Sequence, residues 1–382
     1  MTSISRSYLT LVITHVSLCI SVLPREAVVS RQTQTTEKAV VSSHTQTKYE
    51  FSAVVYDVLL DQLGRNMELL KLEIQLLTKH PFGFFSLKED DGLCFYYTGV
   101  HVEVFELLEK ICASIYTHFD SYDGKNVQIL PFKDQLFLVL MKLRLNHDFI
   151  DLSQRFGVSR TTTYRIFRSL LPVLHLTVFQ AFMNKIPSRR RIRQSLPACF
   201  SSFTNCRVVI DCTEMRCESP SDMAEQKLVY SSYKKYTSAK VAICVLPNGA
   251  AVACSSCYPG STSDKAIVMH SNILKGLEKG DMILANKGFL IADLLPQGVT
   301  LNILPFLTQK QFTPSQVMST RSIAKARIHI ERFNARLKRY RILQLIPRSK
   351  FQYVTMIVQT CVGLVNFKDP LLKETSLWNN NF

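Results

Sequence analysis

The sequence predicts an α/β protein in which an all-α part comes first and a mixed β-sheet with flanking helices follows. Two observations carry this prediction. Between residues 51 and 171 apolar side chains recur mostly at helical spacing, whereas from residue 206 short apolar runs alternate with turn signals, as in strands. The chain has 382 residues and is 47% hydrophobic, enough for two or three domains with a large core.

The charge balance favours a polyanionic partner. Lys and Arg number 46 against 30 Asp and Glu, a net charge of +16. The 11 cysteines are scattered, mostly in apolar runs, which indicates buried thiols in a reducing compartment. Cys254 and Cys257 have the spacing of a zinc pair, but no second pair follows, so packing is the favoured interpretation.

The N-terminal region gives few functional signals. Residues 1–50 are expected to form a flexible tail and residues 51–125 a helical region, with helices over 51–78 and 102–119 and a loop over 81–100. Residues 8–23 only weakly resemble a signal segment, because polar residues interrupt them and no cleavage site follows. The apolar run 351–365 is too short and too polar for a membrane span and predicts a core helix, so no membrane partner is expected.

Residues 126–185 have a helix-turn-helix pattern. Helices are predicted over 131–145, 149–156 and 159–171, with Gly157 in the turn and the third helix halted by Pro172. Ser159 is a good N-cap, and the small core would be formed by Leu152, Phe156, Val158, Ile166 and Phe167. An ordinary helical hairpin is the alternative. On the helix-turn-helix interpretation the polar face of the third helix contacts duplex DNA through Arg160, Thr161, Thr162, Tyr164, Arg165 and Arg168.

Residues 186–205 form a basic linker that would either follow phosphates or be a solvated loop, and residues 369–382 a C-terminal tail. Between them, residues 206–368 predict strands over 207–210, 240–246, 250–255, 282–285 and 299–304, and helices over 260–277, 314–342 and 350–367. Three antiparallel strands, a helix, a parallel strand and late helices form an RNase H-like order. In this topology the first and fourth strands lie side by side and parallel.

The predicted topology brings together residues that are far apart in the sequence. Asp211 ends the first strand, Asn286 follows the fourth, and Glu331 lies on a late helix. Asp211 and Glu331 are therefore predicted to be catalytic and to bind Mg²⁺ or Mn²⁺, which would align water or a 3′-hydroxyl with a scissile phosphate. Asn286 is a degenerate ligand position, because its amide offers only a neutral carbonyl oxygen to a hard cation.

Other polar residues are expected near this site. Asp264 lies in a loop that is expected at the same end of the sheet. It is either a further catalytic carboxylate and metal ligand or a helix N-terminal residue stabilised by the helix dipole. Lys287, Arg327 and Arg332 would contact DNA phosphates. For Glu331 alone, a solvated ion-pair face with Arg327 and Arg332 is the alternative.

The ordered motifs from about residue 126 to 368 resemble the DDE superfamily endonucleases of PIF/Harbinger-like (ISL2EU-like) transposases. The motifs are Val209–Glu214, Tyr230–Lys240, Tyr258–Asp264, Ala285–Phe289 and Ile323–Arg332. The resemblance implies an RNase H-like core, a divalent metal and DNA strand cleavage. The family motif has Asp where this chain has Asn286, and the N-terminus carries no THAP-type zinc pattern.

The expected function is that of a transposase-derived, divalent-metal-dependent DNA endonuclease whose activity Asn286 impairs. The alternative is a catalytically inactive, domesticated DNA-binding scaffold. A third interpretation, a metal-dependent phosphohydrolase acting on small substrates, is opposed by the basic helix-turn-helix. Double-stranded DNA is the expected partner and the nucleus the expected location, and homo-oligomerisation stays open.

Overall fold

The computed structural model describes residues 61–69, 71–72, 82–117, 129–183, 185–304 and 313–371. Residues 61–69 and 71–72 are helical and fall within the helix expected over 51–78. The tail expected over 1–50, with its signal-like segment, and residues 372–382 lie outside the described residues. None of the described helices is long and apolar enough to cross a bilayer.

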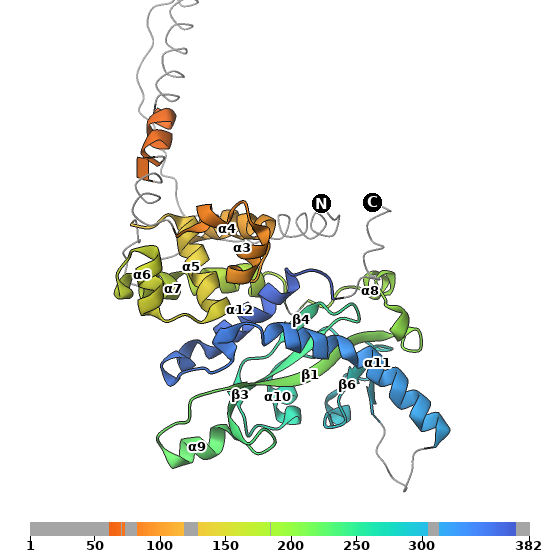
Figure 1. The fold of residues 1–382 in the computed structure, drawn as a ribbon. Coiled ribbons are helices and arrows are strands. Elements are labelled where there is room, and N and C mark those ends of the chain that lie inside the picture. Colours follow the sequence, from red (N-terminus) through yellow and green to blue (C-terminus); the bar gives the residue numbers. More distant parts are fainter. Residues whose placement is uncertain are drawn as a thin grey trace, which may run out of the picture.

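The first part of the structure is entirely helical (Figure 1). Its elements are η1 (Phe84–Leu87), α3 (Asp91–Thr98), α4 (Val102–Tyr116), α5 (Phe132–Leu145), α6 (Phe149–Phe156), α7 (Arg160–His175), η2 (Leu176–Gln180), α8 (Arg189–Gln194) and η3 (Ala198–Phe200). The loop expected over 81–100 is wrong, because Asp90 accepts a hydrogen bond from the amide of Leu93 and starts α3. The basic linker likewise contains a short helix, α8.

The predicted helix-turn-helix is confirmed in α6 and α7. Gly157 takes a left-handed conformation at the turn, and Ser159 caps α7 by accepting from the amide of Thr162 at 3.0 Å. Pro172 does not halt α7, contrary to expectation. The helix continues to His175 and into the π-helical turn η2, because Leu171, Val173 and Leu174 are all buried and their packing outweighs the lost backbone hydrogen bond.

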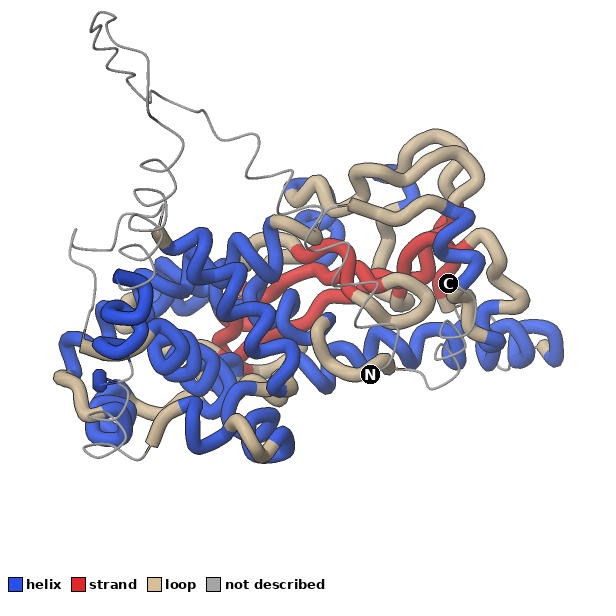
Figure 2. The backbone as a smooth tube through the Cα atoms, turned by 90° about the horizontal axis from the view of Figure 1, so that it is seen from above, coloured by secondary structure: helices blue, strands red, loops and turns tan. Residues whose placement is uncertain are grey.

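The second part is a mixed sheet with helices on both faces (Figure 2). Its strands are β1 (Cys206–Arg216), β2 (Tyr230–Ser231), β3 (Tyr236–Val245), β4 (Ala251–Cys254), β5 (Tyr258–Pro259), β6 (Met282–Ala285) and β7 (Thr300–Ile303). Its other elements are α9 (Met223–Val229), α10 (Asp264–His270), η4 (Ala292–Leu294), α11 (Pro314–Leu337), η5 (Arg341–Leu343), η6 (Arg348–Tyr353) and α12 (Val354–Asn366). The strand order is β2-β3-β1-β6-β7, and β4 and β5 also pair with β3.

This topology confirms the predicted RNase H-like arrangement. β1 pairs antiparallel with β3 and parallel with β6, and β3 pairs antiparallel with β4. β1 is longer than expected and continues to Arg216, whereas α10 ends at His270 instead of about residue 277. The residues after α10 stay in the core without a helix, since Ile273, Leu274 and Leu277 are buried.

The two faces of the sheet enter different cores. Val209, Val241 and Leu284 pack in the cluster that includes α11, α12 and the helical part, whereas Ile210 and Ala285 pack with α10 in a second cluster. Alternate residues of a strand point to opposite faces. Asp211, in phase with Val209, therefore faces α11, and Cys212, in phase with Ile210, faces α10.

Helix α12 joins the helical part to the sheet (Figure 1). It contacts α7, η2 and β4, and the side chains of His175 and Gln359 hydrogen-bond at 2.9 Å. A Cβ atom added to Gly363 would lie 2.3 Å from the carbonyl oxygen of Val178, so the two backbones approach as closely as glycine allows. The helix-turn-helix and the sheet consequently share one continuous core.

Candidate active site

The parallel pairing of β1 and β6 sets the first two site positions. Ile210 aligns with Ala285 in the last register pair, so Asp211 and Asn286 are the residues that follow this pair along each strand direction. Both strands point the same way, and Asp211 and Asn286 therefore lie at the carboxyl end of the parallel pair. This arrangement agrees with the geometry expected from the sequence.

Helix α11 brings Glu331 and Asn334 close to Asp211. Thr313 and Gln316 form a capping box and Pro314 opens the helix, so the sequence defines where α11 begins. From α11, Asn334 Nδ2 donates to Asp211 Oδ2 at 3.1 Å. Burial and the Glu331 carboxylate raise the pKa of Asp211 to about 7, which Arg327 partly offsets. Asp211 and Glu331 are thus close enough to repel each other.

Arg327 lies among these carboxylates and is not on the surface. It is only 7% exposed, and its Nη2 atom lies 3.6 Å from Oε1 of Glu331, which is one turn further along α11. Its Nε and Nη2 atoms have no hydrogen-bond partner among the described residues. Its buried guanidinium thus offsets the negative charge of the site, in a position unlike that of a surface phosphate contact.

Asp264 lies at the same end of the sheet as these residues, beside the turn that follows Asn286, but on the side covered by α10. Lys240 Nζ is 2.6 Å from Oδ1 of Asp264 and also donates to the carbonyl of Thr262 at 3.2 Å. Burial opposes the charge on Lys240, but its hydrogen bond to Asp264 raises the pKa of the amine above its ordinary value. Asp264 still contributes to the raised pKa of Asp211, yet its nearest positive partner is a lysine of the α10 face.

The alternative role expected for Asp264, a helix N-terminal residue stabilised by the helix dipole, also fits in part. Asp264 occupies the first turn of α10, directly after the N-cap Ser263. The structure therefore brings Asp211, Asn286 and Glu331 to one edge of the sheet and holds Asp264 beside them in an ion pair.

The side chain of Asn286 is used locally. Its Oδ1 accepts from the backbone amide of Lys287 at 2.9 Å, and its carbonyl accepts from Phe289, which closes the turn after β6. Asn286 and Lys287 are exposed. Asparagine and aspartate both form such turns, so this backbone conformation is compatible with a carboxylate at position 286.

The ligand atoms of the site suit a hard divalent cation, but the site has fewer anionic ligands than such a cation usually takes. Carboxylate oxygens of Asp211 and Glu331 are the ligand type that Mg²⁺ and Mn²⁺ prefer. Across the described residues, no three His, Cys, Asp or Glu side chains come together as a metal site. The same finding applies to Cys254 and Cys257, which are not joined by further ligands.

The residues expected to contact DNA on α7 fall into two groups. Arg160, Thr161 and Tyr164 are exposed, and Thr162 and Arg165 are half-buried. Arg168 lies between two aromatic rings, 5.6 Å from the centre of Tyr164 and 5.1 Å from that of Tyr353. Arg168 therefore contributes to the junction between α7 and η6. Of the other expected phosphate contacts, Lys287 and Arg332 are exposed, unlike Arg327.

Sequence reasoning missed two residues of the site. Asn334 lies three residues after Glu331 and therefore on the same side of α11, a helical spacing that could have indicated its contact with Asp211. Lys240 belongs to one of the motifs given above, but its ion pair with Asp264 could not be predicted. That pair depends on the β1–β3 register, in which Lys240 lies opposite Glu214. That register is a tertiary feature without a local signal.

Comparison with known families agrees with both parts of the structure. Residues 210–366 match the DDE superfamily endonuclease family, and residues 128–178 match the helix-turn-helix of DDE superfamily endonuclease. No curated protein and no solved structure matches the chain. The first range covers the strand β1 that carries Asp211 and the helix α11 that carries Glu331, and the second covers helices α5 to α7. The chain therefore contains a DDE superfamily endonuclease domain preceded by the helix-turn-helix domain of that superfamily.

Proposed function

We propose that this chain is a transposase-derived protein that binds double-stranded DNA and whose metal-dependent strand cleavage is impaired. The observation that carries the proposal is the neutral side chain at position 286 together with the Lys240–Asp264 ion pair. One anionic ligand is missing, and Asp264, the carboxylate expected to supply a further ligand, is already paired with the ammonium group of Lys240. In this proposal the DDE-type fold holds DNA and cleaves it poorly.

The proposal includes a PIF/Harbinger-like, ISL2EU-like origin and a nuclear location. The ordered motifs quoted above support a PIF/Harbinger-like, ISL2EU-like origin, and a DNA partner supports a nuclear location. A divalent cation, Mg²⁺ or Mn²⁺, would be held by Asp211 and Glu331 and would stabilise charge on a scissile phosphate. Asn334 orients the Asp211 carboxylate, and Arg327 offsets part of its negative charge.

DNA binding is tested with the full chain, because the helix-turn-helix shares its core with the sheet. A fluorescently labelled duplex should bind with steep salt dependence, since each phosphate contact releases about one counterion. Arg160→Ala and Arg165→Ala should each weaken binding several-fold and lower the salt slope by about 1. Fluorescence anisotropy across a salt series measures both quantities.

Lys88→Ala serves as the matched control, because Lys88 is exposed and follows η1, outside α7. It removes one positive charge without touching the helix-turn-helix and should leave the affinity within about twofold. An affinity that does not change with salt, or equal losses for Lys88→Ala and Arg160→Ala, would refute the role assigned to α7.

A further inference from the structure

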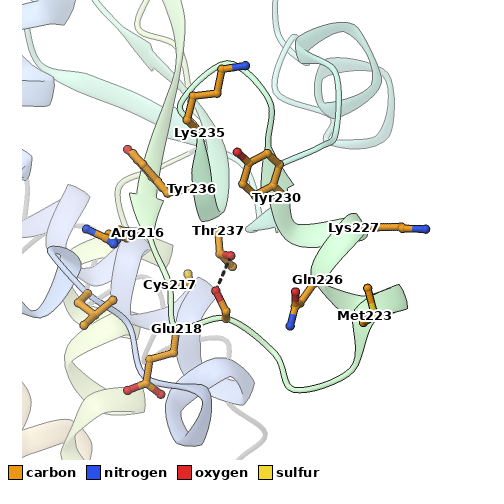
Figure 3. Close-up of a pocket in the computed structure, with 12 residues that line it drawn as sticks. Arg216, Cys217, Glu218, Met223, Gln226, Lys227, Tyr230, Lys235, Tyr236 and Thr237 are labelled. Atoms are coloured by element: carbon orange, nitrogen blue, oxygen red, sulfur yellow. Dashed lines mark hydrogen bonds between the residues drawn. The ribbon is translucent and has the colours of Figure 1, made fainter.

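A pocket of about 650 Å³ lies where β1 ends, between α9 and the hairpin formed by β2 and β3 (Figure 3). Its volume falls within the range of roughly 300–1,000 Å³ typical of small-ligand sites. Its walls come from the end of β1, from one side of α9 and from the hairpin. Neither the helix-turn-helix nor the carboxylates of the candidate active site take part in it.

The rim of the pocket combines aromatic rings with positive charge. Tyr230 and Tyr236 lie at the hairpin beside Lys235, and Arg216 lies 5.7 Å from the ring centre of Tyr236 (Figure 3). The hairpin residues 230–236 include three tyrosines and two lysines, and Tyr233 near the tip is 81% exposed. Exposed rings next to cations provide stacking surfaces for bases and charge for the phosphates that join them.

The middle of the pocket offers hydrogen-bonding groups. Thr237 lies there, with its hydroxyl 2.9 Å from that of Ser219 (Figure 3). Gln226 of α9 donates from Nε2 to the carbonyl of Pro220 at 2.8 Å, which fixes an amide whose oxygen can still accept. The one carboxylate among the lining residues is Glu218, which accepts from the backbone amide of Arg348. The other charged lining residues, Arg216, Lys227 and Lys235, are all positive.

The hairpin has a lysine at a position where glycine would be less strained. Lys235 has a φ of 62°, in the left-handed region that non-glycine residues rarely adopt, and its amide donates to Ser231. This strained backbone position places the positive charge of a lysine at the rim of the pocket.

The pocket is also linked to the candidate active site. Ser261 donates to the carbonyl of Leu228 at the end of α9, and a Cβ on Gly260 would collide with Ser238, so the loop that carries Asp264 is packed against the pocket wall. Along β1, Arg216 follows Asp211 by five residue steps, which span about 17 Å.

We propose that this pocket binds an unstacked nucleotide of the DNA strand whose phosphate lies at the candidate active site. The inference rests on the proposed function, because it takes DNA as the bound partner. The tyrosines would stack on the base, Thr237 and Gln226 would contact its edge, and Arg216 and Lys235 would neutralise the flanking phosphates. The ligand is therefore single-stranded DNA, in contrast to the duplex assigned to α7.

The test measures binding of the full chain to a fluorescent dT12 oligonucleotide and, in parallel, to a blunt duplex. Tyr230→Ala should weaken dT12 binding at least fivefold, because stacking on one ring is lost, and should change duplex binding less than twofold. Tyr230→Phe keeps the ring and should keep the affinity. Lys235→Asn removes the charge, tolerates the left-handed backbone and should weaken dT12 binding.

Tyr96→Ala is the matched control, since Tyr96 is an exposed ring on α3 and should not affect dT12 binding. The inference is overturned if the wild-type chain fails to bind dT12, or if Tyr230→Ala binds it as tightly as the wild-type chain. It is also overturned if dTMP alone binds as tightly as dT12, because the ligand would then be a free nucleotide. The duplex arm reports separately on the proposed function, since its loss would refute that function whatever Tyr230→Ala does.

Discussion

Asn286→Asp is expected to turn a chain that nicks supercoiled plasmid little or not at all into one that nicks it readily with Mg²⁺ or Mn²⁺. The substitution restores an anionic oxygen beside Asp211, at the carboxyl end of the β1–β6 pair. The rate should rise on the order of 100-fold, since a single preorganised electrostatic contact is worth roughly 10²–10³ in rate. The turn after β6 should survive, because aspartate can accept the same amide hydrogen bond from Lys287.

The gain should disappear when Asp211→Asn or Glu331→Gln is added, because all three side chains would hold the same cation. Asn272→Asp is the matched control, since it adds one charge at an exposed position after α10 and should not produce nicking. Efficient nicking by the unmodified chain would contradict the proposal. A folded, DNA-binding Asn286→Asp variant that still does not nick would favour a non-catalytic scaffold.

The strand that precedes Asn286 was predicted with its observed bounds, Met282–Ala285, whereas α7 and α10 were not. A short buried strand between Gly280-Asp281 and a polar loop has clear local boundaries. The end of α7 is decided by tertiary packing, because buried residues on either side of Pro172 keep the helix intact. At the end of α10, Ser271 breaks the helix while the apolar pattern continues in the core without it.

The pair Asp211 and Glu331 could be inferred from sequence because strand order and late-helix position fix it. The position of Asp264 could not be resolved in the same way. Its two alternatives depend on which face of the sheet its loop packs against and on the β1–β3 register that brings Lys240 to it. The burial of Arg327 could not be predicted from the sequence either, since a basic residue on a basic helix is usually solvated.

Gly363→Ala is expected to destabilise the whole chain. The added Cβ would lie 2.3 Å from the carbonyl oxygen of Val178 and 2.8 Å from its carbon, and both are backbone atoms that cannot turn aside. Overpacking of this kind costs about 3 kcal/mol of unfolding free energy. Chemical denaturation followed by circular dichroism would measure the loss.

Because α12 contacts both α7 and β4, the effect should not be confined to one domain. The midpoint at which duplex binding is lost should shift together with the midpoint of the circular dichroism signal. Gly64→Ala is the control, since Gly64 is helical with nothing within 4 Å of an added Cβ, and helix propensity predicts a gain of up to about 1 kcal/mol. If Gly363→Ala unfolds like the wild-type chain, α12 is not packed against η2, and the DNA-binding helices and the sheet are separate units that can be expressed apart.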